Sequence, residues 1–336
     1  MADSSLVEIL DSLPKFKNEA ILKSFIKSYS IINRPTNKKI LCSISGGADS
    51  DVMLDLIYRV DVDKKVEYVW FDTGLEYHAT RDHLEYLEKR YGIQIQRERA
   101  TKPIPLCVKE YGEPFLSKFV SQSIEALQRY DFAFEDEPYD KLIIKYPKIP
   151  GYLKWWCNEY PYKNSIYNIN YHKYLKCFLM NYPPEFKISA KCCKYAKKNV
   201  SDSLIKSVGY DLVITGIRKA EGGIRSAIYK NCYSEGEKKY RPLFWFTNDD
   251  RYIYEKAFNI KHSNCYTRYG FSRTGCVGCP YNRNLLIDLS RIKRNEPRLY
   301  NAASNVFANS YEYTSRYRRF VRQMKNKEKG RKGLFD

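Results

Sequence analysis

The feature that most constrains the fold is a pair of adjacent glycines between a short apolar run and a helical apolar pattern. Residues 39–44 (KILCSI) form the apolar run, Gly46 and Gly47 follow it, and residues 51–60 carry apolar side chains at helical spacing. This order predicts a buried strand, a tight turn and a helix. Such a turn presents backbone N–H groups at the positive end of a helix, where a phosphate group binds well.

The same alternation continues along the chain. Strands are predicted at residues 66–71 and 93–95, with a helix at residues 78–90 between them. Residues 211–216 predict a further strand, and residues 241–246 are a candidate for another. Repeated strand–helix–strand units predict a parallel sheet with helices on its faces, so we expect an α/β fold.

The domain organisation is predicted from changes in pattern and composition. Residues 1–35 read as a helical segment, and residues 36–290 as the nucleotide-binding domain. Within that domain, residues 101–190 are rich in aromatic side chains and prolines without a clear period, and we expect a mostly helical insertion there. Residues 291–336 have helical spacing and a basic end, which predicts a basic helical C-terminal extension.

Charge points to phosphate-bearing partners. The chain has 58 lysines and arginines against 39 aspartates and glutamates, a formal net charge of +19. Nucleotides and nucleic acid would be attracted by such a charge. An AT-rich genome is an alternative cause, because Lys, Asn, Ile and Tyr are all abundant. Nucleic acid, whether tRNA or DNA, is therefore one candidate partner.

The cysteines and the N-terminus indicate a cytoplasmic protein. No run approaches the roughly 18 to 20 apolar residues of a membrane-spanning helix, and the first residues lack a basic start followed by an apolar core. Ten cysteines, with an adjacent pair and a CxxC, suggest thiols kept reduced for metal or redox work. We expect no membrane partner.

The loop at residues 45–50 (SGGADS) has the chemistry of a phosphate site. Gly46 and Gly47 permit positive φ and a close approach of the backbone, while the hydroxyls of Ser45 and Ser50 can donate to phosphate oxygens. Asp49 would repel a phosphate unless Mg²⁺ bridges the two. The alternative is a bare turn that binds no ligand.

Two groups of cysteines stand apart from the rest. Cys276 and Cys279 form a CxxC whose sulfurs can converge on one metal, whereas the adjacent Cys192 and Cys193 need a special backbone to share a centre. A cluster, a zinc site and unmetallated thiols all remain open, and Cys265 can replace one member of the adjacent pair. The other cysteines are expected to be packing residues: Cys42, Cys107, Cys157, Cys177 and Cys232.

Residues 45–50, directly after a predicted strand, resemble the PP-loop of the adenine nucleotide alpha hydrolase group, which includes ATP pyrophosphatases and the PAPS (3'-phosphoadenosine-5'-phosphosulfate) reductase family. Residues 71–76 (FDTGLE), with Asp72, Thr73 and Gly74, resemble that group's second nucleotide-side loop. The resemblance implies a Rossmann-like fold of the HUP type and an adenine nucleotide ligand: ATP with Mg²⁺, or adenylyl sulfate (APS) or PAPS. Ala48 departs from the family pattern, which often has lysine there.

Two further stretches resemble the PAPS reductase family. Residues 215–221 (TGIRKAE) end a strand with Arg218, and Arg225 follows; both are expected to contact phosphate or sulfate. Either these arginines or Lys or Arg side chains of the insertion are expected to supply the cation that the missing lysine would provide. Alternatively, Arg218 pairs with Glu221 or Asp211. Residues 269–280 resemble the family's GF-x-R-x-GC-x-x-CP signature. The order CC…CxxC resembles the APS reductase branch and implies a 4Fe-4S cluster on four ligands: Cys192, Cys193, Cys276 and Cys279.

The expected reaction is activation by ATP rather than reduction. Reductases of this family use a cysteine in a C-terminal segment, and no cysteine follows Cys279 in the printed sequence. We expect Asp49, Ser50 and Arg218 to serve ATP cleavage with release of pyrophosphate, followed by sulfur insertion into nucleic acid or a small acceptor. A cysteine desulfurase or a reductant protein is a candidate partner. The alternatives are an APS or PAPS reductase that uses Cys107, Cys157 or Cys177, and a nucleotide-sensing regulator that binds DNA.

Overall fold

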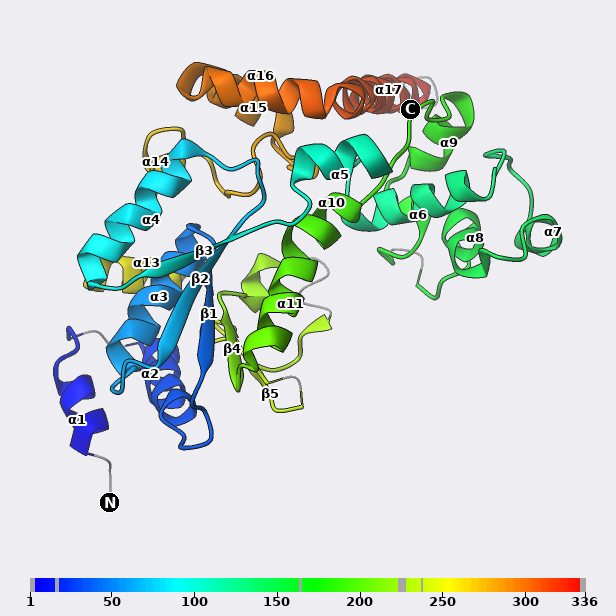
Figure 1. The fold of residues 1–336 in the computed structure, drawn as a ribbon. Coiled ribbons are helices and arrows are strands. Elements are labelled where there is room, and N and C mark those ends of the chain that lie inside the picture. Colours follow the sequence, from blue (N-terminus) through cyan, green and yellow to red (C-terminus); the bar gives the residue numbers. More distant parts are fainter. Residues whose placement is uncertain (1–3, 16–17, 163–164, 223–227, 237, 333–336) are drawn as a thin grey trace. The chain divides into compact units, whose positions relative to one another are not determined.

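The computed structural model describes residues 4–15, 18–162, 165–222, 228–236 and 238–332. The chain folds as two units, each built from two stretches of sequence. Unit 1 contains Met1–Thr101 and Lys197–Cys276, and unit 2 contains Lys102–Ala196 and Val277–Asp336. The first unit carries the sheet, and the second is helical (Figure 1).

The sheet of unit 1 has six strands in the order β3-β2-β1-β4-β6-β5. All neighbouring pairs are parallel except β5 and β6, which form an antiparallel edge. The strands are β1 (Ile40–Ile44), β2 (Val66–Asp72), β3 (Ile95–Arg99), β4 (Leu212–Thr215), β5 (Tyr233–Ser234) and β6 (Lys239–Tyr240). The predicted α/β class with a mostly parallel sheet is therefore confirmed.

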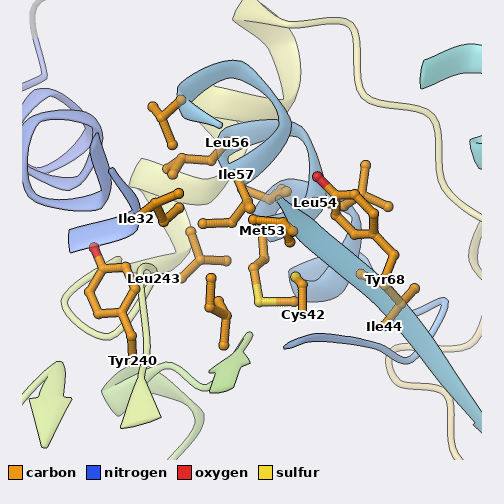
Figure 2. Close-up of a cluster of buried hydrophobic side chains, with 14 of the residues drawn as sticks. Ile32, Cys42, Ile44, Met53, Leu54, Leu56, Ile57, Tyr68, Tyr240 and Leu243 are labelled. Atoms are coloured by element: carbon orange, nitrogen blue, oxygen red, sulfur yellow. The ribbon is translucent and has the colours of Figure 1, made fainter. Parts of the chain in front are cut away.

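Helices cover both faces of this sheet. Cys42 of β1 belongs to a large cluster with side chains of α2 and α3, whereas Leu41, on the opposite face, packs with residues of α11. Figure 2 shows part of the larger cluster, with Met53 and Ile57 of α3 beside Cys42. The helices of unit 1 are α1 (Ser4–Asp11), α2 (Glu19–Ile32), α3 (Ala48–Val60), α4 (His78–Tyr91), α11 (Asn199–Val208), α13 (Asn248–Ala257) and α14 (Asn264–Thr267), with a 3-10 turn at Lys219–Glu221.

Three elements differ from the sequence predictions by more than one residue at an end. The helix after the glycines begins at Ala48, earlier than predicted, because Asp49 and Asp51 suit the positive end of a helix. Strand β3 begins at Ile95 and continues through polar residues. Residues 241–246 form turns rather than a strand, since Pro242 has no N–H to donate, and β6 precedes them.

Unit 2 is built around aromatic side chains. Trp155, Trp156, Phe115 and Phe178 are fully buried in one cluster with Tyr313 of the last helix. Its helices are α5 (Ile104–Tyr111), α6 (Lys118–Arg129), α7 (Tyr139–Lys145), α8 (Pro150–Cys157), α9 (Leu175–Asn181), α10 (Lys191–Cys193), α15 (Leu285–Asn295), α16 (Pro297–Val306) and α17 (Ala308–Lys332), with a 3-10 turn at Ile169–Tyr171. A π-helical turn at Lys194–Lys198 carries the chain from α10 toward α11.

A buried carboxylate fixes the start of α17. The two oxygens of Glu113 accept hydrogen bonds of 2.7 Å from the side chain of Asn309 and the backbone N–H of Ser310. This contact satisfies N-terminal groups of the helix and places a negative charge at its positive end. Across the described part of the chain, every helix is too short or too polar to cross a membrane.

Candidate functional site

The candidate site lies in unit 1 at the carboxyl end of β1. This strand pairs with β2 on one side and β4 on the other, so the loops that follow the strands leave in opposite directions. Such a switch point opens a crevice at the carboxyl edge of a parallel sheet, where ligands bind. The sequence analysis selected residues 45–50, 71–76 and 215–221, which lie at the carboxyl ends of β1, β2 and β4 and in the segments that follow these strands.

Gly46 gives the first loop its shape. Its φ is +66°, and a Cβ at this position would lie 2.8 Å from Cγ2 of Thr80. Only glycine fits here without strain, because an L side chain would need both an unfavourable backbone and a displaced neighbour. The loop is closed by a hydrogen bond of 2.9 Å from the backbone N–H of Ser45 to Oγ of Ser50. Ser50 is buried, so its hydroxyl supports the loop from within.

Two N–H groups of this loop donate to hydroxyl oxygens. Gly47 N–H donates to Oγ of Ser45 at 3.4 Å, and Ala48 N–H donates to the hydroxyl of Tyr266 at 3.2 Å. The Tyr266 hydroxyl also lies 3.0 Å from Oγ1 of Thr274. Burial raises the pKa of Tyr266, which keeps its phenol neutral. The hydroxyl oxygens of Ser45 and Tyr266, which are uncharged, thus accept from two backbone N–H groups at the N-terminus of α3, a place where an anion can bind.

Asp49 holds two guanidinium groups. Its Oδ1 accepts from Nε of Arg218 at 2.8 Å and from Nη1 of Arg251 at 3.1 Å. Arg218 is 4% exposed, and its Nη1 donates to the carbonyl oxygens of Phe246 and Thr247. The backbone N–H of Arg218, by contrast, donates to Glu221. Two cations therefore lie beside the first turn of α3.

A chain of ionic contacts continues behind Arg251. Its Nε lies 3.0 Å from Oε1 of Glu255, and Nε2 of His262 lies 3.1 Å from the same oxygen. Nδ1 of His262 is 2.8 Å from Oδ2 of the fully buried Asp51, whose Oδ1 lies 3.0 Å from Nε2 of His83. Although burial opposes the charge, contacts with Asp51 and Glu255 raise the pKa of His262 to about 9. The His262 imidazole is therefore a cation at neutral pH.

The second loop places a carboxylate at the end of β2 and lies beside the thiol of Cys276. Oδ1 of Asp72 accepts from the N–H of Gly74 at 2.9 Å, and Oδ2 of the same residue pairs with Arg81 at 3.2 Å. The Thr73 hydroxyl donates to Glu76 at 2.6 Å and lies 3.7 Å from Sγ of Cys276. Burial raises the pKa of Glu76, so this carboxyl is a weaker acid than an exposed one.

The thiols of unit 2 gather near one phenol. Cys192, Cys193 and Cys279 all interact electrostatically with the hydroxyl of Tyr281, whose pKa burial raises far above its usual value, with these thiols adding to the rise. Gly278, inside the CxxC, has a φ of +62°. A Cβ at this position would collide with the Tyr311 hydroxyl, so only glycine fits there. Soft sulfur ligands of this kind suit iron–sulfur clusters or zinc.

The thiols of Cys192, Cys193 and Cys279 do not form a complete metal-binding site in the described part of the structure. Within the described residues, no three His, Cys, Asp or Glu side chains are grouped so that they could hold a metal ion. The ten cysteines all lie in described segments and none forms a disulfide. The thiols thus suit a cluster or zinc by the chemistry of their donors alone.

The remaining predicted residues fall in three places. Cys265 is fully buried in unit 1, with its Sγ 3.8 Å from Oγ1 of Thr80. Cys42 is buried in β1 and Cys232 in the edge region, as expected for packing residues. Arg225 lies outside the described residues.

Sequence reasoning missed Arg251, His262 and Tyr266. Arg251 and His262 follow the loop that the analysis treated as a strand, so no motif drew attention to them. Tyr266 lies just before the segment 269–280 that was compared with the reductase signature. One signal was available: the run TNDDR combines a helix N-cap with acidic residues, and it predicts a helix that would present Arg251 within its first turns.

Residues 39–146 match the phosphoadenosine phosphosulfate reductase domain. This stretch contains β1, the glycine loop, β2, the second loop and β3, and it continues into unit 2. The matched segment includes the loops after β1 and β2, whereas the loop after β4, with Arg218, lies outside it.

Individual proteins are similar over different parts of the chain. An uncharacterized protein of Methanocaldococcus jannaschii is 26% identical over 286 residues, which are 84% of this chain and 43% of that protein. A GMP synthase (glutamine-hydrolyzing) of Sulfurimonas denitrificans is 33% identical over 109 residues, 32% of this chain and 19% of the synthase. The chain thus spans less than half the length of either relative.

Among solved structures, the phosphoadenylyl-sulfate reductase of Candida auris in its phosphate complex aligns with a TM-score of 0.39 and 12% identity. The alignment covers 82% of this chain and 96% of the reductase.

Proposed function

We propose that the protein binds an adenine nucleotide at residues 45–50 and uses ATP, with release of pyrophosphate, to activate an acceptor for sulfur insertion. The observation that carries this proposal is the glycine loop after β1. Its amides donate to hydroxyl oxygens at the positive end of α3, and two arginines lie beside them. A phosphate group could replace those hydroxyls and meet both guanidinium groups.

The chemistry is a nucleotidyl transfer followed by a displacement. An acceptor oxygen attacks the α-phosphorus of ATP, the bond to the bridging oxygen of the β-phosphate breaks, and pyrophosphate leaves. The terminal sulfur of a persulfide, supplied by a partner such as a cysteine desulfurase, then attacks the activated carbon, and AMP leaves with the former acceptor oxygen. Two thiols of a reductant protein cleave the resulting S–S bond: the carrier leaves as its thiolate, the sulfur stays on the carbon, and the reductant is oxidised to a disulfide. Sulfur thereby replaces the acceptor oxygen, and the oxidation state of the acceptor carbon does not change.

The residues of unit 1 have separate tasks in this proposal. The Gly47 and Ala48 amides bind a phosphate, Ser50 holds the loop closed, and Arg218 stabilises charge on the phosphates. Asp49 orients the guanidinium groups, and it is the carboxylate through which Mg²⁺ bound to the phosphates would contact the loop. Asp72, Thr73 and Gly74 form the facing nucleotide-side loop. Arg225 remains a proposed phosphate contact.

We also propose that Cys192, Cys193, Cys276 and Cys279 are the ligands of a 4Fe-4S cluster. Such a cluster supplies an iron that can hold or transfer sulfur, or it supplies electrons. Support comes from the thiols around Tyr281 and from Gly278, which lets the CxxC backbone take its turn. Iron and sulfide analysis of anaerobically purified protein, compared with the Cys192→Ser variant, tests this; one zinc ion without iron would refute it.

A nucleic acid is the proposed acceptor because of α17. Among the side chains of this helix that the structure describes, six cations from Arg316 onward are exposed: Arg316, Arg319, Arg322, Lys325, Lys327 and Lys329. Exposed lysines and arginines along one helix follow a phosphate backbone, and their binding weakens as salt rises. Titrating tRNA and duplex DNA at two salt concentrations tests this part, and the loss of affinity should be steep for the preferred nucleic acid.

Reduction of APS or PAPS is the second candidate, which the domain match at residues 39–146 favours. It needs a thiolate that attacks sulfur. Burial raises the pKa of the Cys107 and Cys157 thiols, which makes both poor nucleophiles at neutral pH. Cys177 is exposed and is the candidate that remains for this reaction.

One experiment separates the candidates. The anaerobically purified protein is incubated with ATP, APS or PAPS in turn, and the nucleotide consumed and the product formed are measured. Release of pyrophosphate from ATP supports the proposal, whereas sulfite from APS or PAPS, together with an S-sulfonate on Cys177, supports reduction. Binding of ATP without turnover, with or without DNA, supports a nucleotide-sensing regulator.

A further inference from the structure

We propose that Arg251 is a phosphate-binding residue of the nucleotide site and that the chain of contacts through Glu255, His262 and Asp51 positions it. This inference rests on the proposed function, since it concerns the same loop and the same ligand. It adds a residue outside every stretch that resembles a known nucleotide motif, and it assigns a task to a buried ionic network that the proposed reaction does not otherwise use.

The loop lacks a cation of its own. Between Ser45 and Ser50 the one charged side chain is Asp49, which is negative, and Ala48 occupies the position between the second glycine and Asp49. The two amides and the partial positive charge of the helix dipole neutralise only a small part of the negative charge of a triphosphate. The site therefore requires cations from other elements, and among the residues that the structure describes, Arg218 and Arg251 contact the loop through Asp49.

The two arginines are not equivalent. Arg218 has 5% of its side chain exposed and also donates to backbone carbonyls, so its guanidinium is largely committed to holding the protein together. Arg251 has 29% of its side chain exposed, and in the described part of the structure its contacts run through Nη1 and Nε. Its Nη2 is thus available to donate to a ligand, and Asp49 can release Nη1 when a phosphate arrives.

The network behind Arg251 fixes its direction. Glu255 lies one turn further along α13, and its Oε1 is 3.0 Å from Nε of Arg251 in an ionic contact without hydrogen-bond geometry, so charge attraction draws the guanidinium group from behind. His262 joins Glu255 to Asp51, which sits on α3 one turn after the glycines. The same helix that carries the phosphate loop therefore anchors the arginine that faces it.

Such a network is costly for a purely structural purpose. Asp51 is fully buried between two imidazoles, and apolar side chains of similar volume would fill this space with no charge to desolvate. Buried charges are retained where they hold a functional group in place. The last member of this series of ionic contacts is the partly exposed guanidinium group of Arg251, which contacts Asp49 of the loop.

The test compares binding of a non-hydrolysable ATP analogue with binding of adenosine, both in the presence of Mg²⁺, in wild type and in Arg251→Met. We expect the variant to bind the analogue about 10- to 100-fold more weakly and adenosine equally well, because one charge-assisted contact to phosphate is lost. Adding Ala48→Lys to Arg251→Met should restore most of the affinity, since a lysine in the loop replaces the missing cation. Rescue of this kind is not expected from a merely structural arginine.

Two further variants keep the test decisive. Arg129→Met removes an arginine that also pairs with a glutamate one helical turn away, in unit 2, and it should leave both affinities unchanged. Glu255→Gln should weaken analogue binding by less than Arg251→Met, as expected for a positioning residue. If Arg251→Met does not fold, Arg251→Lys takes its place and should bind at an intermediate level.

The outcomes separate the inference from the function on which it rests. Wild-type protein that binds no adenine nucleotide overturns the proposed function and the role of Arg251 together. Wild-type binding that Arg251→Met retains, or loses equally for adenosine, overturns the inference alone. Loss for the analogue without rescue by Ala48→Lys also contradicts it, because then charge at the loop is not what Arg251 supplies.

Discussion

Nε of Arg218 lies 2.8 Å from Oδ1 of Asp49, although the two residues are 169 positions apart in the sequence. This ion pair joins the loop after β4 to the first turn of α3, and it shares its carboxylate oxygen with Arg251. Asp49 is thus the common anchor of both cations, a structural task that precedes any contact with a nucleotide.

Asp49→Asn should lower the free energy of unfolding by about 1 to 3 kcal/mol, because two poorly solvated guanidinium groups lose their counter-charge. The figure is below that of a fully buried pair, since 21% of the Asp49 side chain is exposed. Urea unfolding measures it. Asp63→Asn is the matched control, because that carboxylate is 67% exposed and only 3.8 Å from Lys65. An equal loss of free energy in both variants would show that the contacts of Asp49 stabilise the fold no more than an exposed ion pair does.

Gly46→Ala should destabilise unit 1 and abolish nucleotide binding. The backbone at φ +66° costs an alanine about 1 to 2 kcal/mol, and the new Cβ must also displace Cγ2 of Thr80. Thermal unfolding and nucleotide titration check the two effects. Gly209→Ala is the control, because its φ is +72° and a Cβ there meets nothing within 4 Å.

The steric part of the Gly46 effect can be isolated. Thr80→Ser removes the methyl group that a Cβ at position 46 would meet, so it should recover part of the stability in the double variant while leaving the backbone cost in place. If Thr80→Ser recovers nothing, the clash inferred from the wild-type coordinates is relieved in another way.

Tyr266→Phe should tighten nucleotide binding by about 3- to 10-fold. In the wild type, a phosphate must displace the Tyr266 hydroxyl from the N–H of Ala48, and a hydrogen bond of this kind contributes about 0.5 to 1.5 kcal/mol net. Isothermal titration with the non-hydrolysable ATP analogue measures the change. Tyr77→Phe is a suitable comparison, since Tyr77 is buried in the same unit. Weaker binding in Tyr266→Phe would mean that the hydroxyl shapes the loop instead of occupying it.

The sequence predicted the sheet because its signals are local. Alternating apolar runs and helical patterns identify β1, α3, β2 and α4, and a glycine pair at a strand end marks the loop that we propose to bind phosphate. The prediction of a strand at residues 241–246 was wrong. The apolar side chains there belong to buried turns: Leu243 and Phe244 are fully buried but do not pair in the sheet.

The site was harder to predict because its charges meet through tertiary contacts. Asp51 and His262 are 211 positions apart, and neither belongs to a motif with a fixed spacing. Arg218 was found because residues 215–221 follow a predicted strand and resemble a stretch of the PAPS reductase family. Arg251 was missed because its approach to Asp49 depends on where α13 packs against α3, which no local pattern specifies.

The last prediction concerns pH and His262. This imidazole faces Asp51 and Glu255, and the ring of Tyr266 lies 5.8 Å away. Its pKa rises from 6.5 to about 9 in the folded state. A raised pKa means that the folded state holds the proton more tightly than the unfolded state. The stabilisation is therefore complete below pH 6.5 and is lost as pH rises toward 9, with a limit of roughly 3 kcal/mol.

The measurement is the free energy of unfolding between pH 6 and pH 9.5, compared with that of His262→Gln. Subtracting the two curves cancels groups that titrate equally in both proteins, such as exposed thiols. The wild type should lose its advantage over His262→Gln steadily across this range, because the glutamine carries no proton to release. Two parallel curves would mean that His262 is neutral in the folded protein, and the link from Asp51 through Glu255 to Arg251 would then lack the positive charge that balances its two carboxylates.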